Sequence, residues 1–107
     1  MTLHKICILG AGTLGSRVAL QSAISGFTVS IFDLKQASLD SAILTMQKIL
    51  RQLVRGGTLT ESQVPEILQR IQPTLDLAEA LKDADLVNES VTEDVTSKKP
   101  LWPEEGN

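Results

Sequence analysis

A chain of 107 residues has room for one small domain, and 42% apolar with 21% charged residues is ordinary globular composition. Two Phe, one Trp, no Tyr and a net charge of −3 argue against a stacking platform for single-stranded nucleic acid and against a general binder of phosphate backbones. Residues 1–57 carry six basic and two acidic side chains, whereas residues 58–107 carry four basic and eleven acidic ones. An anionic ligand is therefore expected to bind the first half of the chain.

The single cysteine and the short apolar runs indicate the compartment. Cys7 cannot form a disulfide within the chain, so nothing points to an oxidising environment. Glycines interrupt the apolar run that begins at Ile6, and no run approaches the roughly 18 apolar residues of a membrane helix. A cytoplasmic protein without a membrane partner is expected.

The first third of the chain has the pattern of a strand, a helix and a second strand. Residues 5–9 form a short, nearly continuous apolar run, which is typical of a strand buried on both faces of a parallel sheet. Apolar residues recur at helical spacing over residues 13–25, and Gly26 is placed to end that helix in the left-handed conformation. Residues 27–32 alternate and are rich in β-formers, which predicts a strand that stops at Asp33.

The later elements are shorter, apart from one long helix. Apolar spacing predicts a helix over residues 37–55, ended by two glycines, and Thr60 with Gln63 resembles a capping box that opens a short helix over 61–70. Pro73 is expected to break the chain before a short extended piece at 74–75. Asp76 is expected to cap a helix over 77–82, followed by a strand over 84–91.

These elements predict an α/β fold, a Rossmann-type parallel sheet with helices on both faces, incomplete at about four strands. Residues 1–97 are expected to form this partial domain. The polar residues 98–107, which contain two prolines, are expected to form a tail.

One motif carries the functional interpretation. Gly10-Ala11-Gly12-Thr13-Leu14-Gly15 matches G-x-G-x-x-G, follows an expected strand and opens an expected helix. The first glycine permits a tight turn, the second leaves room for a diphosphate beside the backbone, and the third allows close packing of helix and strand. Amide groups at the start of the helix would bind the diphosphate. The alternative is that these glycines serve only as a turn.

Asp33 lies eighteen residues after Gly15, at the end of the second strand, where a carboxylate would accept hydrogen bonds from the adenosine ribose. A 2′-phosphate would meet like charge there, so NAD is favoured over NADP, although Lys35 is close enough to weaken that argument. The alternative role for Asp33 is that of a helix cap. A methyltransferase would also use a glycine turn and an acid after the second strand, but the glycine spacing here suits a dinucleotide.

The sequence resembles the N-terminal NAD-binding domain of the 3-hydroxyacyl-CoA dehydrogenase family, which includes 3-hydroxybutyryl-CoA dehydrogenases. The resemblance extends from about residue 4 to residue 102 and lies in the glycine motif, in Ile31-Phe32-Asp33, in residues 76–87 and in residues 89–93. It implies oxidation of an L-3-hydroxyacyl-CoA to its 3-keto form with hydride transfer to NAD, a reaction of fatty acid metabolism.

The resemblance assigns roles to further residues. Glu93 and Lys98 match an acid and a lysine that lie along the cofactor, with ordinary surface charges as the alternative. Lys48, Arg51 and Arg55 share one face of the long helix and are candidates for contacts with the phosphates of coenzyme A, although such a row is often only a solvated face. The chain departs from the family at one strand position, where Asn88 replaces an apolar residue.

The resemblance also implies that the family's catalytic His, its Glu partner, the substrate-orienting Ser and Asn, and a helical catalytic domain fall beyond residue 107. His4 precedes the first strand, about 20 Å from the expected cofactor edge, and cannot replace the catalytic base. The chain alone is therefore expected to bind NAD(H) without turnover, and to need the missing domain for acyl-CoA. The alternative is a non-catalytic module that associates, with itself or another partner, through an exposed sheet edge.

Overall fold

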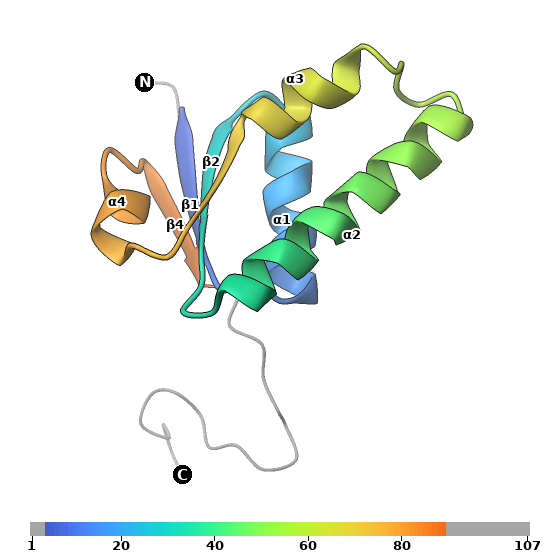
Figure 1. The fold of residues 1–107 in the computed structure, drawn as a ribbon. Helices are drawn as coiled ribbons and strands as arrows, with labels where there is room; N and C mark the ends of the chain where they lie inside the picture. The colour runs from blue at the N-terminus through green and yellow to red at the C-terminus, as the bar shows by residue number, and fades with distance from the viewer. Residues whose placement is uncertain (1–3, 90–107) are drawn as a thin grey trace, which may run out of the picture.

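The computed structural model describes residues 4–89, which form one parallel sheet with helices on both faces (Figure 1). The four strands run side by side in the order β3-β2-β1-β4. Their bounds are Lys5–Leu9 for β1, Thr28–Phe32 for β2, Ile71–Thr74 for β3 and Leu86–Glu89 for β4. The expected fold class is confirmed. The tail expected over residues 98–107 lies outside the described residues.

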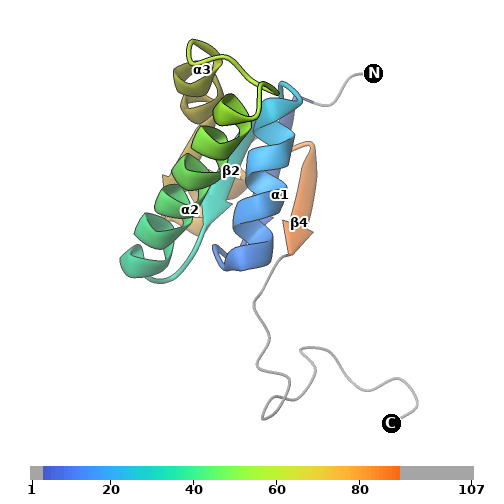
Figure 2. The ribbon, with the colours of Figure 1, turned by 90° about the vertical axis from the view of Figure 1, so that its right-hand side faces the viewer.

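Three helices cover one face of the sheet and a short fourth helix covers the other (Figures 1 and 2). The first group consists of α1 (Thr13–Ile24), α2 (Gln36–Arg55) and α3 (Gln63–Gln69). The fourth is α4 (Leu77–Leu81), which packs on β2 and β3. No helix in the described part of the chain has the length and apolarity needed to cross a lipid bilayer.

The main core lies between the sheet and α1, α2 and α3. Alternate strand residues point toward these helices, so Ile8 and Ile31 are fully buried beside each other and pack in one cluster with Met46 and Leu50 of α2. Cys7 has the opposite orientation, and burial raises the pKa of its thiol, which therefore stays protonated at neutral pH.

The helices end where the sequence predicts because glycine permits backbone angles that other residues rarely adopt. Gly26 has φ +106° and follows Ser25, the C-cap residue of α1, as expected for a left-handed cap. Gly57 has φ +83° just after α2, so a side chain at either position would strain the turn.

Three expected boundaries were wrong. Pro73 does not break the chain, because it lies within β3, which is an edge strand of the sheet. The carbonyls of Arg70 and Thr74 accept hydrogen bonds from the N–H groups of Val29 and Asp33. The nitrogen of Pro73 therefore lies on the outer side of the strand, where no hydrogen bond is needed. The short helix begins at Gln63 rather than residue 61. The last strand begins at Leu86 rather than residue 84, after a turn in which Asp83 has φ +60°.

Candidate functional site

The carboxyl ends of β1 and β2 bring the glycine motif and Asp33 together at one edge of the sheet. The two strands pair in parallel, with Leu9 opposite Phe32. The next residue, Gly10, donates its backbone N–H to the carbonyl of Phe32 at 2.8 Å. Ligands of open α/β sheets bind at this edge, where neighbouring loops diverge.

The turn between β1 and α1, which we call the glycine turn (residues 10–15), leaves backbone donors exposed. Gly10 has φ +111°, a conformation that favours glycine. Gly12 is the N-cap of α1 and provides no side-chain cap, and no acidic residue lies in the first turn. The first N–H groups of a helix have no partner within it, so the amides that follow Gly12 are directed at the edge with the positive end of the helix dipole.

Asp33 holds the glycine turn in place. Its Oδ2 accepts the N–H of Ala11 at 2.9 Å, and its Oδ1 accepts the N–H of Lys35 at 3.0 Å. A carboxylate has about four acceptor positions, so capacity remains for hydroxyl groups of a ligand. The link from Asp33 to Ala11 was not predicted from the sequence, although an acid at the end of the neighbouring strand is a signal for it.

Two grooves flank the glycine turn. One of about 230 Å³ is lined by the apolar side chains of Leu9, Phe32 and Leu34 together with Gly10 and Asp33. The other, of about 300 Å³, runs between the turn and α2 and is lined by Ala11, Gly12, Thr13, Ser16, Ala37, Ser38, Ser41, Ala42 and Thr45. The sequence reasoning missed the hydroxyl residues of α2, whose spacing of three and four residues places them on one helix face.

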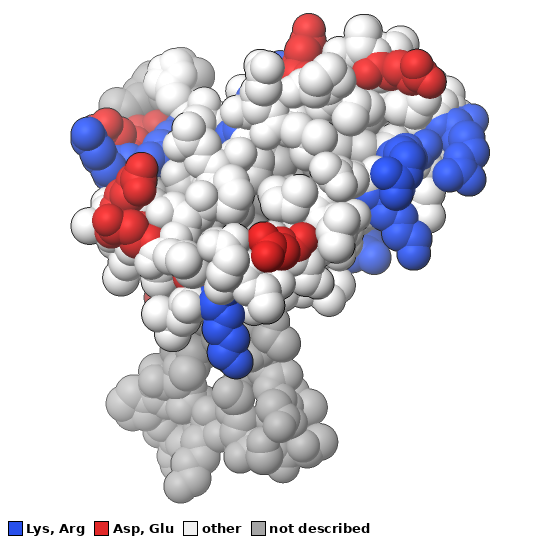
Figure 3. All heavy atoms as spheres, in the orientation of Figure 1, with Lys and Arg blue, Asp and Glu red and all other residues white. Residues whose placement is uncertain are grey.

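The basic row on α2 is exposed but extends away from the glycine turn. Lys48, Arg51 and Arg55 are all exposed, and basic side chains gather over this helix (Figure 3). A rise of 1.5 Å per residue puts Lys48 roughly 18 Å and Arg55 roughly 28 Å along α2 from Gln36. Arg51 and Arg55 line a separate groove of about 410 Å³ together with Val54, Glu61, Val64 and Pro65.

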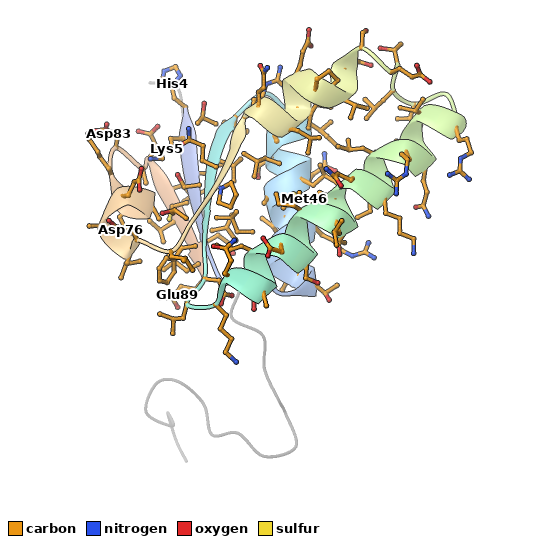
Figure 4. The ribbon with its side chains drawn as sticks, viewed as in Figure 1. His4, Lys5, Met46, Asp76, Asp83 and Glu89 are labelled. Atoms are coloured by element: carbon orange, nitrogen blue, oxygen red, sulfur yellow. The ribbon has the colours of Figure 1, made fainter. Side chains whose placement is uncertain are left out.

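The remaining candidates lie elsewhere. His4, the only histidine of the chain, is exposed at the amino end of β1, at the opposite end of the sheet from Glu89 (Figure 4). Asn88 is half-buried on β4, opposite Ile8. Glu93 and Lys98 lie outside the described residues. The described chain contains no group of three His, Cys, Asp or Glu side chains arranged to hold a metal ion.

A parallel sheet with a glycine turn, free helix amides and an acid at the next strand end defines a dinucleotide-binding domain of the Rossmann type. A family model described as "3-hydroxyacyl-CoA dehydrogenase, NAD binding domain" matches residues 5–105. The chain therefore belongs to the 3-hydroxyacyl-CoA dehydrogenase family, as the resemblance in sequence predicted, and carries the family's NAD-binding domain.

Individual relatives support this assignment. The chain is 40% identical over 97 residues to a fatty acid oxidation complex subunit alpha of Idiomarina loihiensis, covering 91% of this chain and 13% of that protein. It is 29% identical to a probable 3-hydroxybutyryl-CoA dehydrogenase of Bacillus subtilis, covering 95% of this chain and 35% of the other. The crystal structure of (S)-3-hydroxybutyryl-CoA dehydrogenase from Ralstonia eutropha superposes with a TM-score of 0.82 at 30% identity, covering 87% of this chain and 32% of that one. The chain thus spans a minor part of each relative.

Proposed function

We propose that this chain binds NAD(H) as the nucleotide-binding part of an L-3-hydroxyacyl-CoA dehydrogenase of fatty acid metabolism. The observation that carries the proposal is the pairing of open helix amides after Gly12 with the carboxylate of Asp33, which is hydrogen-bonded to the same turn. The two groups suit the diphosphate and the adenosine ribose of one dinucleotide.

The described residues fit this cofactor. The amides of the glycine turn would bind the diphosphate, and no side chain of Gly12 stands between them and the ligand. The apolar groove beside Leu9 and Leu34 would receive adenosine, with its ribose hydroxyls donating to Asp33. Bound NAD supplies the hydride acceptor for oxidation of the substrate. A 2′-phosphate would be repelled by Asp33, and the contact that Lys35 makes with this carboxylate is through its backbone N–H, which favours NAD over NADP.

The substrate roles follow from family membership and from charge. Glu93 and Lys98 are proposed to lie along the cofactor, and Lys48, Arg51 and Arg55 to attract the phosphates of an acyl-CoA. No acidic residue occurs between Asp40 and Glu61, so the three basic side chains would favour an anionic ligand along this part of α2, and Glu61 is the one acid in the groove that Arg51 and Arg55 line.

Residues 1–107 alone are proposed to bind cofactor without turnover. General base catalysis needs a titratable group within hydrogen-bonding reach of the reacting hydroxyl, and the chain's one histidine lies at the wrong end of the sheet. Mixing this chain with NADH and acetoacetyl-CoA should give no loss of NADH absorbance. Oxidation of NADH that depends on acetoacetyl-CoA would contradict this part of the proposal.

Substitution of Asp33 tests the cofactor assignment. Asp33→Asn keeps the size of the side chain but removes its charge, so the NADH dissociation constant should rise about tenfold, as expected for loss of a charge-assisted hydrogen bond. The preference for NADH over NADPH should fall in the same variant. Isothermal titration calorimetry measures both.

Asp40→Asn is the matched control, because Asp40 is exposed on α2 and bonds to Gln36 rather than to the glycine turn. Equal NADH affinity in the wild type and Asp33→Asn would contradict the assignment. So would binding of S-adenosylmethionine in preference to NADH, which would instead indicate a methyltransferase.

Removing basic charge from α2 tests the acyl-CoA contact. Arg51→Gln and Arg55→Gln should each weaken coenzyme A binding up to about fivefold at low salt, because exposed ion pairs contribute up to ~1 kcal/mol. Lys82→Gln, on the opposite face of the sheet, is the control and should leave the affinity unchanged. Titration calorimetry at two salt concentrations measures the affinity for coenzyme A. An identical affinity in the wild type and all variants would show that Arg51 and Arg55 do not contact the coenzyme.

A specific observation favours the second candidate, a module that associates through a sheet edge. Within residues 4–89, β4 pairs with β1 on one side only, and its Leu86 and Val87 are exposed. Light scattering over a concentration series would show an increase in mass for such a module. A constant monomer mass would rule it out for copies of this chain.

A further inference from the structure

A further groove, of about 270 Å³, lies where α4 packs on β2 and β3 (Figure 1). It is lined by Ser30, Ile71, Gln72, Pro73, Thr74 and Glu79. None of these residues lines the two grooves beside the glycine turn. We call it the α4 groove, and it is separate from the site proposed for the cofactor.

The strand residues that face α4 supply polar groups to this groove. Val29 and Ile31 point into the core beneath α1, α2 and α3, so Ser30 between them points to the α4 face. Ser30 pairs with Gln72 in the parallel register of β2 and β3, and Thr74 has the same orientation as Gln72 because it is two residues further on. Two hydroxyl groups and an amide therefore lie on one side of the sheet, next to α4.

Ser30 is buried without a partner for its hydroxyl group. Only 3% of its surface is exposed, and within residues 4–89 its Oγ forms no hydrogen bond. This oxygen is not sealed in the interior, because every fully enclosed side-chain oxygen or nitrogen among the described residues has a partner. The Ser30 Oγ therefore opens into the α4 groove. Since a buried hydroxyl group without a hydrogen bond costs free energy, a ligand that supplies one is favoured.

Glu79 adds a carboxylate from the α4 side. Its Oε1 accepts a hydrogen bond from the Thr74 hydroxyl at 3.3 Å, and its backbone N–H donates to Asp76 Oδ1 at 3.2 Å. These bonds hold Glu79 beside β3. Its Oε2 has neither a hydrogen bond nor an ion pair with any described residue, so it is available to a donor in the groove.

The charge around the α4 groove is negative. No lysine or arginine lines it, and residues 76–89 contain five acidic side chains and one basic one. Acidic side chains gather over α4 in Figure 3, and Asp76 lies beside this helix in Figure 4. The groove therefore attracts cations and repels phosphates and carboxylates.

We propose that the α4 groove binds the ammonium group of a primary amine. An ammonium group has three N–H donors, and the groove offers acceptors on three elements, namely Ser30 Oγ on β2, Gln72 Oε1 on β3 and the Glu79 carboxylate on α4. Neighbouring strands are about 4.8 Å apart, so one small group can bond to both Ser30 and Gln72. The volume lies just below the roughly 300–1,000 Å³ of pockets for drug-sized ligands, which suits a small amine or a single lysine side chain.

NMR titration of the full chain with methylammonium chloride tests the proposal. The total salt is kept constant by replacing tetramethylammonium chloride, which has the same charge but no N–H donor. Saturable shifts are expected at the backbone amides of Ser30, Gln72, Thr74 and Glu79, with a dissociation constant on the order of 10 mM for a ligand of so few atoms. Shifts that never saturate, or shifts absent from these amides, would overturn the proposal.

Two variants remove one acceptor each. Ser30→Ala should weaken methylammonium binding about fivefold without lowering stability in urea, because the hydroxyl has no partner to lose within the described residues. Glu79→Gln should weaken it about tenfold, because it removes the charge. Ser22→Ala and Glu66→Gln are the matched controls, since Ser22 bonds within α1 and Glu66 is exposed on α3. Wild-type affinity in both Ser30→Ala and Glu79→Gln would contradict the proposed site.

The source of the ammonium group is identified by comparing two ligands. N-acetyl-lysine amide that binds more tightly than methylammonium indicates a lysine side chain of a protein, whereas weaker binding indicates a free amine. NADH affinity should be at the wild-type value in Ser30→Ala and Glu79→Gln, because neither residue lines the grooves beside the glycine turn. Failure of amine binding is therefore distinguishable from failure of the proposed function.

Discussion

Asp85, which directly precedes β4, links this strand to the start of β1 through its carboxylate and its backbone. Its Oδ2 accepts the backbone N–H groups of His4 at 2.8 Å and of Lys5 at 2.9 Å, and its own N–H donates to the carbonyl of Lys5 at 2.9 Å. The hydrogen bonds from His4 and then Lys5 lower the pKa of Asp85 below its usual value. The side chain is exposed, and these two backbone hydrogen bonds are the main cause of the lowered pKa.

The lowered pKa predicts a pH dependence of stability with a definite sign. A carboxyl group whose pKa is lower in the folded state stabilises the fold above its unfolded pKa of about 3.9, and this contribution disappears as pH falls through the folded pKa. Asp85→Asn should therefore be less stable than the wild type at pH 7, and the difference should shrink below pH 4. Urea unfolding at several pH values measures it.

The control for this prediction is Glu66→Gln, because Glu66 is an exposed carboxylate on α3, away from the contact between β1 and β4. It should unfold like the wild type across the same pH range. If the free energies of unfolding of Asp85→Asn and the wild type differ by the same amount from pH 7 to pH 3, the charge of Asp85 does not contribute to stability.

At the scale of elements, α2 depends on one buried stripe. Met46 lies in the middle of this helix, is fully buried and packs toward α1 and the sheet (Figure 4). Met46→Ala should lower the free energy of unfolding by about 2–5 kcal/mol, because it removes apolar contacts and leaves a cavity. Urea unfolding at pH 7 provides the measurement.

Leu44→Ala, two residues away on the exposed side of α2, should change the free energy of unfolding by no more than about 0.5 kcal/mol. Equal losses in the two variants would contradict the packing described here, since burial is the main difference between the positions.

The elements also show what the sequence could predict. Hydrophobic periodicity and the glycines at positions 26 and 57 were sufficient to locate α1, α2, β1 and β2, because each signal is local. Asp76 was predicted as the cap of α4, and it accepts the N–H of Glu79 at 3.2 Å. The prediction at Pro73 was wrong because a strand accepts proline only at the edge of a sheet, and the position of a strand in the sheet is a tertiary property that local sequence does not give.

The residue types of the candidate site could be proposed from the sequence, but the hydrogen bonds between them could not. The G-x-G-x-x-G spacing and Asp33 follow from local sequence, whereas the bond from Ala11 to Asp33 requires two strands to pair in one register. The serines and threonine of α2 carry no motif, and only the packing of α2 beside the glycine turn places them in a groove. Roles for Glu93 and Lys98 stay predictions.

At the scale of the whole molecule, charge is unevenly distributed. Basic side chains gather over α2 and acidic ones over α4, and Figure 3 also shows acidic side chains near α3. An anionic coenzyme approaching the protein would therefore be attracted to the α1–α2 side, and the attraction would weaken with salt.

Cofactor binding should stabilise the entire fold, because the site is assembled from β1, α1 and β2, which also enclose the core. A ligand that binds only the folded state at 100 times its dissociation constant adds about 2.7 kcal/mol to stability. Thermal unfolding with and without saturating NADH should therefore show a clear rise in the midpoint. In Asp33→Asn at the same NADH concentration, the rise in the unfolding midpoint should be smaller. An equal rise would show that NADH binding does not depend on the Asp33 carboxylate.

The proline in β3 has a consequence for self-association. Because the nitrogen of Pro73 lies on the outer side of an edge strand, an additional strand added there would find one backbone donor missing. Fibril growth by strand addition is therefore hindered at β3. Within the described sheet, β4 is the other outer strand, and it is the one at which another strand could add.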